Sequence, residues 1–446
     1  METDALRAVS LFSNCGAGDI GYAQAGFNFD VMAELDDRRL SIAALNHPGA
    51  ETVPGDLRET WPTVVESYRD RNGSASPGLL AACPPCQGMS SARSGLGKAN
   101  DPDAGSRDHR NLLVQVIAKV AHALQPRVIV VENVPAFLSR VVRHPKTEQP
   151  ISAAILLARS LHQKYHLAPL LTDLADYGVP QRRRRSFLCF VRREETSFDR
   201  MVEQGRAPFP RPAYGSEFRR DQVTVKEALE SLSAGELDAK KPDLAGTGMH
   251  SVPVWSARHY AMVAAIPPNS GGTAWDNSEC VECGTTAGTE DAECAKCRTP
   301  LPRPIVKEDG NWRLIHGFRT SSYKRMRPES PAATITTASG HMGSDVTLHP
   351  SENRLLSPLE CAHLQTLPAD FKWGDALKKW GTTNVRAMIG EAVPPKFTKQ
   401  HGQILAGLLT GRKTRPAISS CDERVLRAKR ALTTAERAAK RTAIAS

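Results

Sequence analysis

Short apolar runs alternate with segments of helical character in the first part of the chain, and this alternation constrains the fold most. Runs at residues 7–12, 79–82 and 128–131 have the length and composition of strands, and residues 111–124 have the pattern of a helix. Strands that alternate with helices form parallel sheets with helices on both faces. Residues up to about 190 therefore predict an α/β fold with a largely parallel, doubly wound sheet.

A loop of small residues follows the first predicted strand, at residues 13–21. Such a loop lets a ligand approach the backbone, and the start of the next helix favours negative charge. Glu34 follows the second predicted strand, where a carboxylate can bind the hydroxyls of a ribose. Asp56 follows the third and could contact an adenine ring. Either carboxylate alone could be a surface group, but both at strand ends indicate a nucleotide-like ligand.

Cys86 follows two prolines at the end of the apolar run 79–82. The prolines restrict the backbone before the thiol, and a polar segment of residues 90–107 comes after it. This is the pattern of a rigid nucleophile with a mobile lid, although a structural turn with an incidental cysteine is the alternative. Glu132, at the end of the run 128–131, is a candidate proton donor beside the same cleft.

Gln181 precedes four consecutive arginines, which lead into a predicted strand at residues 186–191. The arginines could form a phosphate-binding patch or a solvated surface. Because side chains alternate along a strand, we expect Arg183 and Arg185 to point to one side together.

The composition changes after residue 193. Residues 194–345 are rich in Pro, Gly and Ser and have no long helical period, which predicts a separate, loop-rich domain. Two Cys-x-x-Cys pairs lie within it, with ten residues between them. This spacing favours a structural Cys₄ zinc site over the alternative of two redox dithiols. The candidate ligands are Cys280, Cys283, Cys294 and Cys297.

The net charge of +10 suggests a polyanionic partner. Residues 412–446 hold ten Lys and Arg against three acidic residues, so this basic tail carries most of the excess. It is expected to be helical or disordered, and either to contact nucleic acid or simply to be solvated. No run approaches a membrane-spanning length, and the N-terminus does not resemble a signal peptide, so we expect a cytoplasmic protein without a membrane partner.

Together these features resemble the DNA cytosine-5 methyltransferases of prokaryotic type, in the family's motif order over most of residues 7–410. The segments that carry the resemblance are residues 12–21, Pro84-Pro85-Cys86-Gln87, Glu132-Asn133-Val134, Gln181 with Arg183 and Arg185, residues 354–368 and residues 390–394.

The resemblance implies a Rossmann-like domain that uses S-adenosyl-L-methionine (AdoMet). Residues 1–193 would form this catalytic domain, residues 346–411 would complete it, and residues 194–345 would form a target-recognition domain with the zinc site. The positions implied to bind AdoMet are Phe12, Gly16, Glu34, Leu35, Asp56, Leu57, Pro84 and Leu113.

The resemblance also implies a mechanism, in which the Cys86 thiolate adds to C6 of a cytosine flipped out of duplex DNA. Glu132 would bind the base edge and protonate N3, and Arg185 would hold O2. Arg183 would help to position the site, and Gln181 would belong to the same catalytic set. C5 would then take the methyl group from AdoMet, and loss of the C5 proton would release Cys86.

Several residues depart from the family pattern. Asn14, Ala17 and Cys83 replace glycines, and Leu359 and His363 replace arginines. Glu391 replaces an asparagine, which changes charge and removes a donor near the expected cofactor unless the side chain points to solvent.

Two other functions are compatible with these motifs. They are a catalytically silent DNA-binding protein and a transfer-RNA cytosine-5 methyltransferase, although a binding protein would have no need of Cys86. The partners implied are double-stranded DNA and, functionally, a cognate restriction endonuclease. The resemblance further implies a monomer associated with the nucleoid of a bacterial or phage-infected cell.

Overall fold

The computed structural model describes residues 6–85, 112–144, 147–218, 220–315, 321–412 and 415–445. The chain forms two compact units. Unit 1 consists of Met1–Tyr177, Arg184–Ala213 and Val393–Ser446, and unit 2 of Gly178–Arg183 and Tyr214–Ala392.

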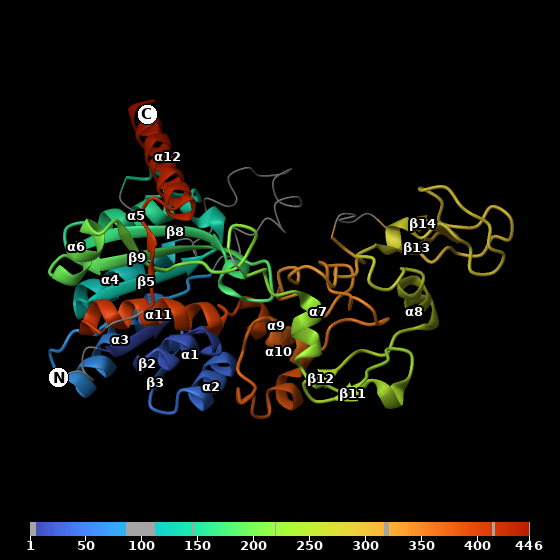
Figure 1. Ribbon diagram of the computed structural model, residues 1–446, viewed down its shortest axis with the longest axis horizontal. Helices are drawn as coiled ribbons and strands as arrows, with labels where there is room; N and C mark the ends of the chain where they lie inside the picture. Colours follow the sequence, from blue (N-terminus) through green and yellow to red (C-terminus); the bar gives the residue numbers. More distant parts are fainter. Residues whose placement is uncertain are drawn as a thin grey trace. The chain divides into compact units, whose positions relative to one another are not determined.

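Unit 1 is built on a seven-stranded sheet with the order β3-β2-β1-β4-β5-β9-β8 (Figure 1). Strands β1 to β5 are parallel, and β9 runs antiparallel to both of its neighbours. The predicted α/β fold with a largely parallel sheet is therefore confirmed. The strands are β1 (Arg7–Leu11), β2 (Asn28–Glu34), β3 (Glu51–Pro54), β4 (Leu79–Ala82), β5 (Val128–Asn133), β8 (Tyr165–Asp173) and β9 (Arg184–Arg192).

The helices of unit 1 bury their apolar sides against the sheet and against each other. Helices α3 (Leu57–Asn72), α4 (Val114–Leu124) and α5 (Ala153–Leu161) contribute to one large hydrophobic core with the strands. Asp36 caps the start of helix α2 (Asp37–Asn46), and Asp56 caps the start of α3. Each carboxylate accepts a hydrogen bond from a backbone N–H in the first turn of its helix. The strand ends therefore pass into capped helices at the edge where ligands of such sheets bind.

Helix α1 (Ala17–Gln24) packs closely against α11 (Pro395–Thr410) (Figure 1). Gly21 allows this approach, because a Cβ atom added there would overlap the Thr398 side chain and the Pro395 carbonyl and lie 2.5 Å from the Lys399 nitrogen. Thr398 Oγ1 also donates a hydrogen bond to the Gly18 carbonyl, at 2.6 Å.

Replacement of Gly21 by alanine is expected to destabilise unit 1 by about 3 kcal/mol, since backbone atoms would have to separate. Thermal unfolding should show a midpoint lowered by roughly 6–12 °C. Gly49→Ala is the matched control, because an added Cβ at Gly49 meets nothing within 4 Å. Equal midpoints for the two variants would contradict this account of the packing.

Unit 1 extends beyond the predicted boundary at residue 193. Helix α6 (Thr196–Glu203) is followed by β10 (Arg206–Pro210), which pairs with β15 (Ala417–Ser419). This pairing of distant segments keeps residues 194–213 in unit 1. The chain passes into unit 2 at Tyr214, about twenty residues after the domain boundary expected at 194.

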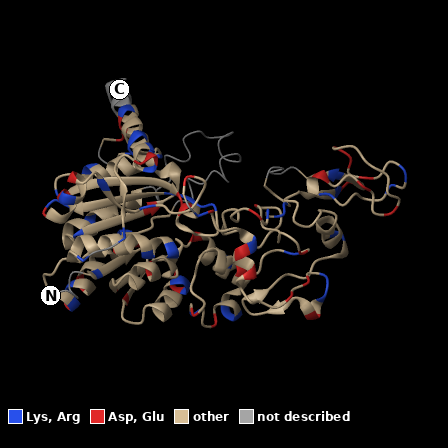
Figure 2. Cartoon of the chain, viewed as in Figure 1, with Lys and Arg blue, Asp and Glu red and all other residues tan. Residues whose placement is uncertain are grey.

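The basic tail is an ordered helix over most of its length, α12 (Glu423–Ala445). Ala428 and Leu432 belong to the large core of unit 1, whereas Arg427 and Arg430 have side chains about 60% exposed. Figure 2 shows the Lys and Arg residues of this helix in blue. The tail therefore stabilises unit 1 with one side and presents positive charge on the other.

Unit 2 contains mostly short elements. It also contains residues 346–392, which were expected to complete the catalytic domain; only the part from Val393 onward, with α11, belongs to unit 1. The reason is local packing, because α9 contacts both α7 and α10. The elements are α7 (Val225–Glu230), β11 (Gly246–Thr247), β12 (His250–Ser251), α8 (Ala257–Ala264), β13 (Ile305–Glu308), β14 (Asn311–Leu314), α9 (Pro358–Leu364) and α10 (Ala376–Glu391).

Helix α9 confirms the predicted capped helix at Ser357. Ser357 and Glu360 form a reciprocal capping box, and Glu360 also pairs with Arg354 at 2.8 Å in a buried ion pair. In the described part of the chain, no helix has both the length and the apolar character needed to span a membrane.

Candidate active site

The loop after β1 has the backbone conformation of a ligand-binding loop. Phe12, Asn14 and Gly16 all have positive φ, of 56°, 50° and 73°. Asparagine tolerates this left-handed conformation better than most residues, so Asn14 preserves a shape that glycine usually provides. The His47 ring closes over Gly16 and donates from Nε2 to its carbonyl at 2.9 Å, leaving no room for a side chain there.

Glu34 is fixed at the end of β2 by backbone donors. Its carboxylate accepts the N–H groups of Asn14 (2.8 Å), Leu35 (3.0 Å) and Asp36 (3.3 Å). Next to it, the Leu35 side chain is 67% exposed, which is unusual for so large an apolar group. A carboxylate that can bind ribose hydroxyls beside an exposed apolar surface is compatible with AdoMet, and the roles of these two residues stay predictions.

The other positions predicted to bind AdoMet differ in exposure. Asp56 is bound to the Arg58 side chain, which lowers the pKa of the Asp56 carboxyl. Leu57 lies in the core of unit 1, where it anchors the start of α3. Of the remaining positions, Phe12 is partly buried, and Pro84 and Leu113 are buried. Their roles toward the cofactor stay predictions.

A polar cluster behind the loop was missed by the sequence reasoning. Asp19 is buried in the first turn of α1, accepts a hydrogen bond from Ser10 at 2.9 Å, and has its pKa raised to about 7 by burial. Ser13 in turn donates to Ser10 at 3.0 Å. Asp19 lies within the small-residue loop, but its burial could not be inferred from a polar residue at a helix start.

Glu132 lies at the end of β5 and is only 6% exposed. Its Oε2 accepts a hydrogen bond from the Cys83 thiol at 2.8 Å. Its Oε1 forms an ion pair with Arg185 Nε at 2.8 Å, but it accepts no hydrogen bond of acceptable geometry from the described residues. A buried carboxylate oxygen of this kind can receive a donor from a ligand.

The segment that leads to Cys86 is hydrogen-bonded to the end of β5. The Asn133 side chain donates to the Pro84 carbonyl at 2.9 Å, two residues before Cys86. Cys86 itself lies outside the described residues, as does the predicted lid, so the position of its thiol stays a prediction.

The arginine run shows the predicted alternation in exposure. Arg182 and Arg184 are exposed, Arg183 is buried and Arg185 is partly buried. Strand β9 begins only at Arg184, however, and Arg183 belongs to unit 2. The reason is that the chain before β9 is bound to unit 2, where the Arg182 N–H donates to the Ala332 carbonyl.

Gln181 and Arg183 have structural partners within unit 2. Arg183 is 1% exposed and donates to the carbonyls of Ile335 (3.1 Å) and Gly390 (2.9 Å). Gln181 is fully buried, accepts the Ile335 N–H at 2.9 Å and donates to Gln365 Oε1 at 3.1 Å. Both side chains therefore join three segments of unit 2, which suits the positioning role expected of Arg183.

Two residues of unit 2 that differ from the family pattern, His363 and Glu391, have defined surroundings in the structure. His363 hydrogen-bonds Ser231, the residue that follows α7, at 3.1 Å, so it contributes to helix packing. Glu391 ends α10 and is partly buried. It is therefore less exposed than a carboxylate that simply points to solvent.

The four cysteines with zinc-ligand spacing converge in unit 2. Their sulfur atoms all lie within 4.8 Å of one another, with 3.4 Å between Cys280 and Cys297 and 3.5 Å between Cys283 and Cys294. Tetrahedral Zn²⁺ with sulfur ligands at about 2.3 Å requires separations of this order. The geometry is compatible with the predicted zinc site.

The two cysteine pairs have the same local structure. In each, the first cysteine accepts a backbone hydrogen bond four residues on, from Gly284 or Arg298, both at positive φ. The second thiol in each hydrogen-bonds a threonine two residues later. Residues 280–299 of unit 2 therefore contain two similar turns, whose cysteines meet in the sulfur cluster.

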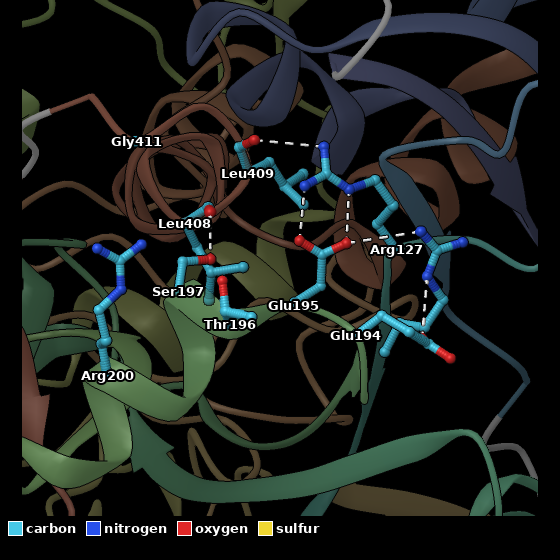
Figure 3. Close-up of a pocket in the computed structure, with 10 residues that line it drawn as sticks. Arg127, Glu194, Glu195, Thr196, Ser197, Arg200, Leu408, Leu409 and Gly411 are labelled. Atoms are coloured by element: carbon cyan, nitrogen blue, oxygen red, sulfur yellow. Dashed lines mark hydrogen bonds and ion pairs between the residues drawn. The ribbon is translucent and has the colours of Figure 1, made fainter.

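A polar pocket of about 430 Å³ lies at the other edge of the sheet in unit 1, where β5 begins and β9 ends (Figure 3). Arg127 binds Glu195 in two hydrogen bonds of 2.6 Å and donates to the Leu409 carbonyl at the end of α11. Arg192 pairs with Glu194 at 3.4 Å. This network joins β5, the start of α6 and α11, and lies away from the predicted site.

Comparison with known proteins gives a consistent result. The family model for C-5 cytosine-specific DNA methylases matches residues 6–405. Type II methyltransferase M1.HgaI of Avibacterium volantium is 26% identical over 87% of this chain and 95% of its own length. Type II methyltransferase M1.BsuMI of Bacillus subtilis (strain 168) is 23% identical over 89% of this chain and 80% of its own length.

Solved structures support the fold. A candidate DNA modification methyltransferase encoded within a prophage (E. coli) aligns with a TM-score of 0.56 and 19% identity over 90% of this chain and 98% of its own. A mutant of Spodoptera frugiperda DNMT2 aligns with a TM-score of 0.51 and 14% identity over 90% of this chain and 99% of its own.

The family match spans nearly the whole chain and includes the loop after β1, Glu132 and the arginine run. The chain belongs to the C-5 cytosine-specific DNA methylase family, and it is an AdoMet-dependent DNA cytosine-5 methyltransferase.

Proposed function

We propose that this enzyme methylates C5 of a cytosine flipped out of a specific sequence in double-stranded DNA, through a covalent bond between Cys86 and C6. The observation that carries the proposal is the hydrogen bonding of the buried Glu132 carboxylate. Its buried Oε1 accepts no well-aligned hydrogen bond from the described residues, while Asn133 beside it binds the chain that leads to Cys86.

The chemistry follows from what each side chain can do. The Cys86 thiolate adds to C6 and makes C5 nucleophilic, and Glu132 binds the N3–N4 edge of the base and stabilises the adduct by proton transfer at N3. Arg185, next to Glu132, holds cytosine O2. Loss of the C5 proton and cleavage of the sulfur–C6 bond then restore Cys86.

AdoMet, when bound, supplies the electrophilic methyl group that C5 attacks. Glu34 would hold its ribose hydroxyls, and Leu35 would lie against its adenine ring. Gly16 would allow the close approach of its polar part to the loop after β1. The exposed Leu35 beside the fixed Glu34 carboxylate supports this assignment.

We also propose that unit 2 recognises the target sequence and that its four cysteines hold one structural zinc ion. A Cys₄ site leaves no open coordination position, so the metal would stabilise the fold and take no part in methyl transfer. Gln181 and Arg183 would act as positioning residues, because they hold segments of unit 2 together.

The test is methyl transfer from labelled AdoMet to duplex DNA and, separately, to transfer RNA, with bisulfite mapping of the product. Transfer to duplex DNA at one recurring sequence is expected, and Cys86→Ala should transfer none while still binding DNA. Preferential transfer to transfer RNA, or equal activity of Cys86→Ala, would overturn the proposal.

The relatives named above are Type II methyltransferases, so we propose that this enzyme belongs to a restriction–modification system. A cognate endonuclease would then cut the same sequence only when it is unmethylated. DNA from cells that express the enzyme should carry 5-methylcytosine at nearly every copy of one short sequence, whereas scattered partial methylation would contradict this role.

A further inference from the structure

The register of two strands places Cys83 beside Glu132. Ala82 on β4 lies opposite Val131 on β5, and the next residues of the two chains are Cys83 and Glu132. Corresponding side chains of neighbouring strands share a face of the sheet and lie about 5 Å apart. Cys83 keeps this alignment because its N–H donates to the Leu11 carbonyl of β1 at 3.2 Å.

The thiol gives the two oxygens of the carboxylate different surroundings. Oε2 accepts the Cys83 S–H at 2.8 Å, whereas Oε1 has only the ion pair with Arg185 among the described residues. A Glu side chain has three rotatable bonds, and an ion pair alone permits several orientations of the carboxylate. A directional hydrogen bond to one oxygen selects the orientation that presents the other.

We propose that Cys83 is a positioning residue that fixes Glu132 for contact with the cytosine edge. The inference rests on the proposed function, in which Glu132 binds the base. Cys83 holds Oε2, and Oε1 is left for the N3–N4 edge of the cytosine, where the N4 amino group is the donor. Glycine, which the resemblance implies for this position, offers no side-chain donor, so the contact depends on the cysteine.

The thiol of Cys83 is suited to this role and not to nucleophilic attack. A thiol is a donor, so Cys83 can hold Oε2 while Oε1 stays available to the substrate. The S–H proton is engaged by the Glu132 carboxylate, whereas nucleophilic attack requires a free thiolate. Cys86 and Cys83 therefore have separate tasks although only two prolines lie between them.

The first test is a set of variants of the full chain, assayed for kcat and for KM toward duplex DNA. Cys83→Ala should lower kcat about three- to tenfold, the effect of losing one hydrogen bond, with KM unchanged. Cys83→Ser should restore most of the rate, because a hydroxyl donates to the same oxygen. Cys421→Ala, at an exposed cysteine outside the site, should have the native rate.

A double-mutant cycle tests whether Cys83 acts through Glu132. In a Glu132→Gln background, Cys83→Ala should cause no further loss of kcat, because the partner is already altered. Equal losses in both backgrounds would overturn the proposal. So would a serine variant as slow as the alanine variant, or a change confined to KM.

A second readout needs neither DNA nor methyl transfer. Glu132→Gln removes the charge beside Cys83 and should raise the rate of its alkylation by iodoacetamide several-fold, measured by peptide mass spectrometry, while Cys421 is unaffected. Equal alkylation rates of Cys83 in the native enzyme and in Glu132→Gln would show that the contact does not form. If Cys83 is alkylated faster in Glu132→Gln but the native enzyme transfers no methyl group, the contact exists and the proposed function is wrong. The catalytic role of the contact would then be wrong as well.

Discussion

Replacement of Glu132 by glutamine is expected to lower the rate of methyl transfer by about 10²- to 10⁴-fold. Glutamine has nearly the same shape, so it can still lie between Cys83 and Arg185. It cannot carry a proton to cytosine N3, and its amide nitrogen is a donor where the base edge also presents donors. The measurement is the single-turnover rate with labelled AdoMet and a duplex that contains the mapped site.

Binding measurements distinguish a chemical loss from a folding defect. AdoMet affinity should be unchanged in Glu132→Gln, because Glu34 and Leu35 lie on a different strand end. Glu66→Gln is the matched control, since Glu66 is exposed on α3 and the same change there leaves the site untouched. A Glu132→Gln enzyme that retains more than a tenth of the native rate would be incompatible with general acid catalysis by this residue.

The sequence could predict the strands and their functional ends because both depend on local patterns. A buried strand such as residues 128–131 is a continuous apolar run, and the polar residue that follows it must lie at the edge of the sheet. Since parallel strands end at one edge, the sequence alone predicts that Glu34 and Glu132 lie at that edge. The cysteine spacing indicated in the same way that the four sulfur atoms converge, because two close pairs need little chain to come together.

The unpredicted features depend on contacts between distant segments. β10 pairs with β15 more than two hundred residues later, and no local pattern indicates this partner or the domain boundary that it moves. To predict the interaction between Cys83 and Glu132, one would have to know the register in which β4 pairs with β5. Arg183 was expected on the strand with Arg185, but contacts of the preceding residues with Ala332 place it in unit 2.

Removal of zinc is expected to unfold the part of unit 2 around residues 279–301. The cysteines themselves form most of the small hydrophobic cluster there, together with Leu301 and Ala287. A segment with so small a core depends on the metal, and a structural zinc site contributes about 10–16 kcal/mol of apparent binding free energy at neutral pH. The purified protein should contain one zinc per chain, and chelation should make this segment sensitive to protease.

The effect should be confined to unit 2. Cys294→Ser should lose the metal and sequence-specific methyl transfer, while AdoMet binding by unit 1 persists. Cys421→Ser changes an exposed cysteine outside the cluster and should keep both the zinc and the activity. If the segment resisted protease equally with and without metal, the four cysteines would have to be stabilised by their own packing, and the alternative of two dithiols would become the better interpretation.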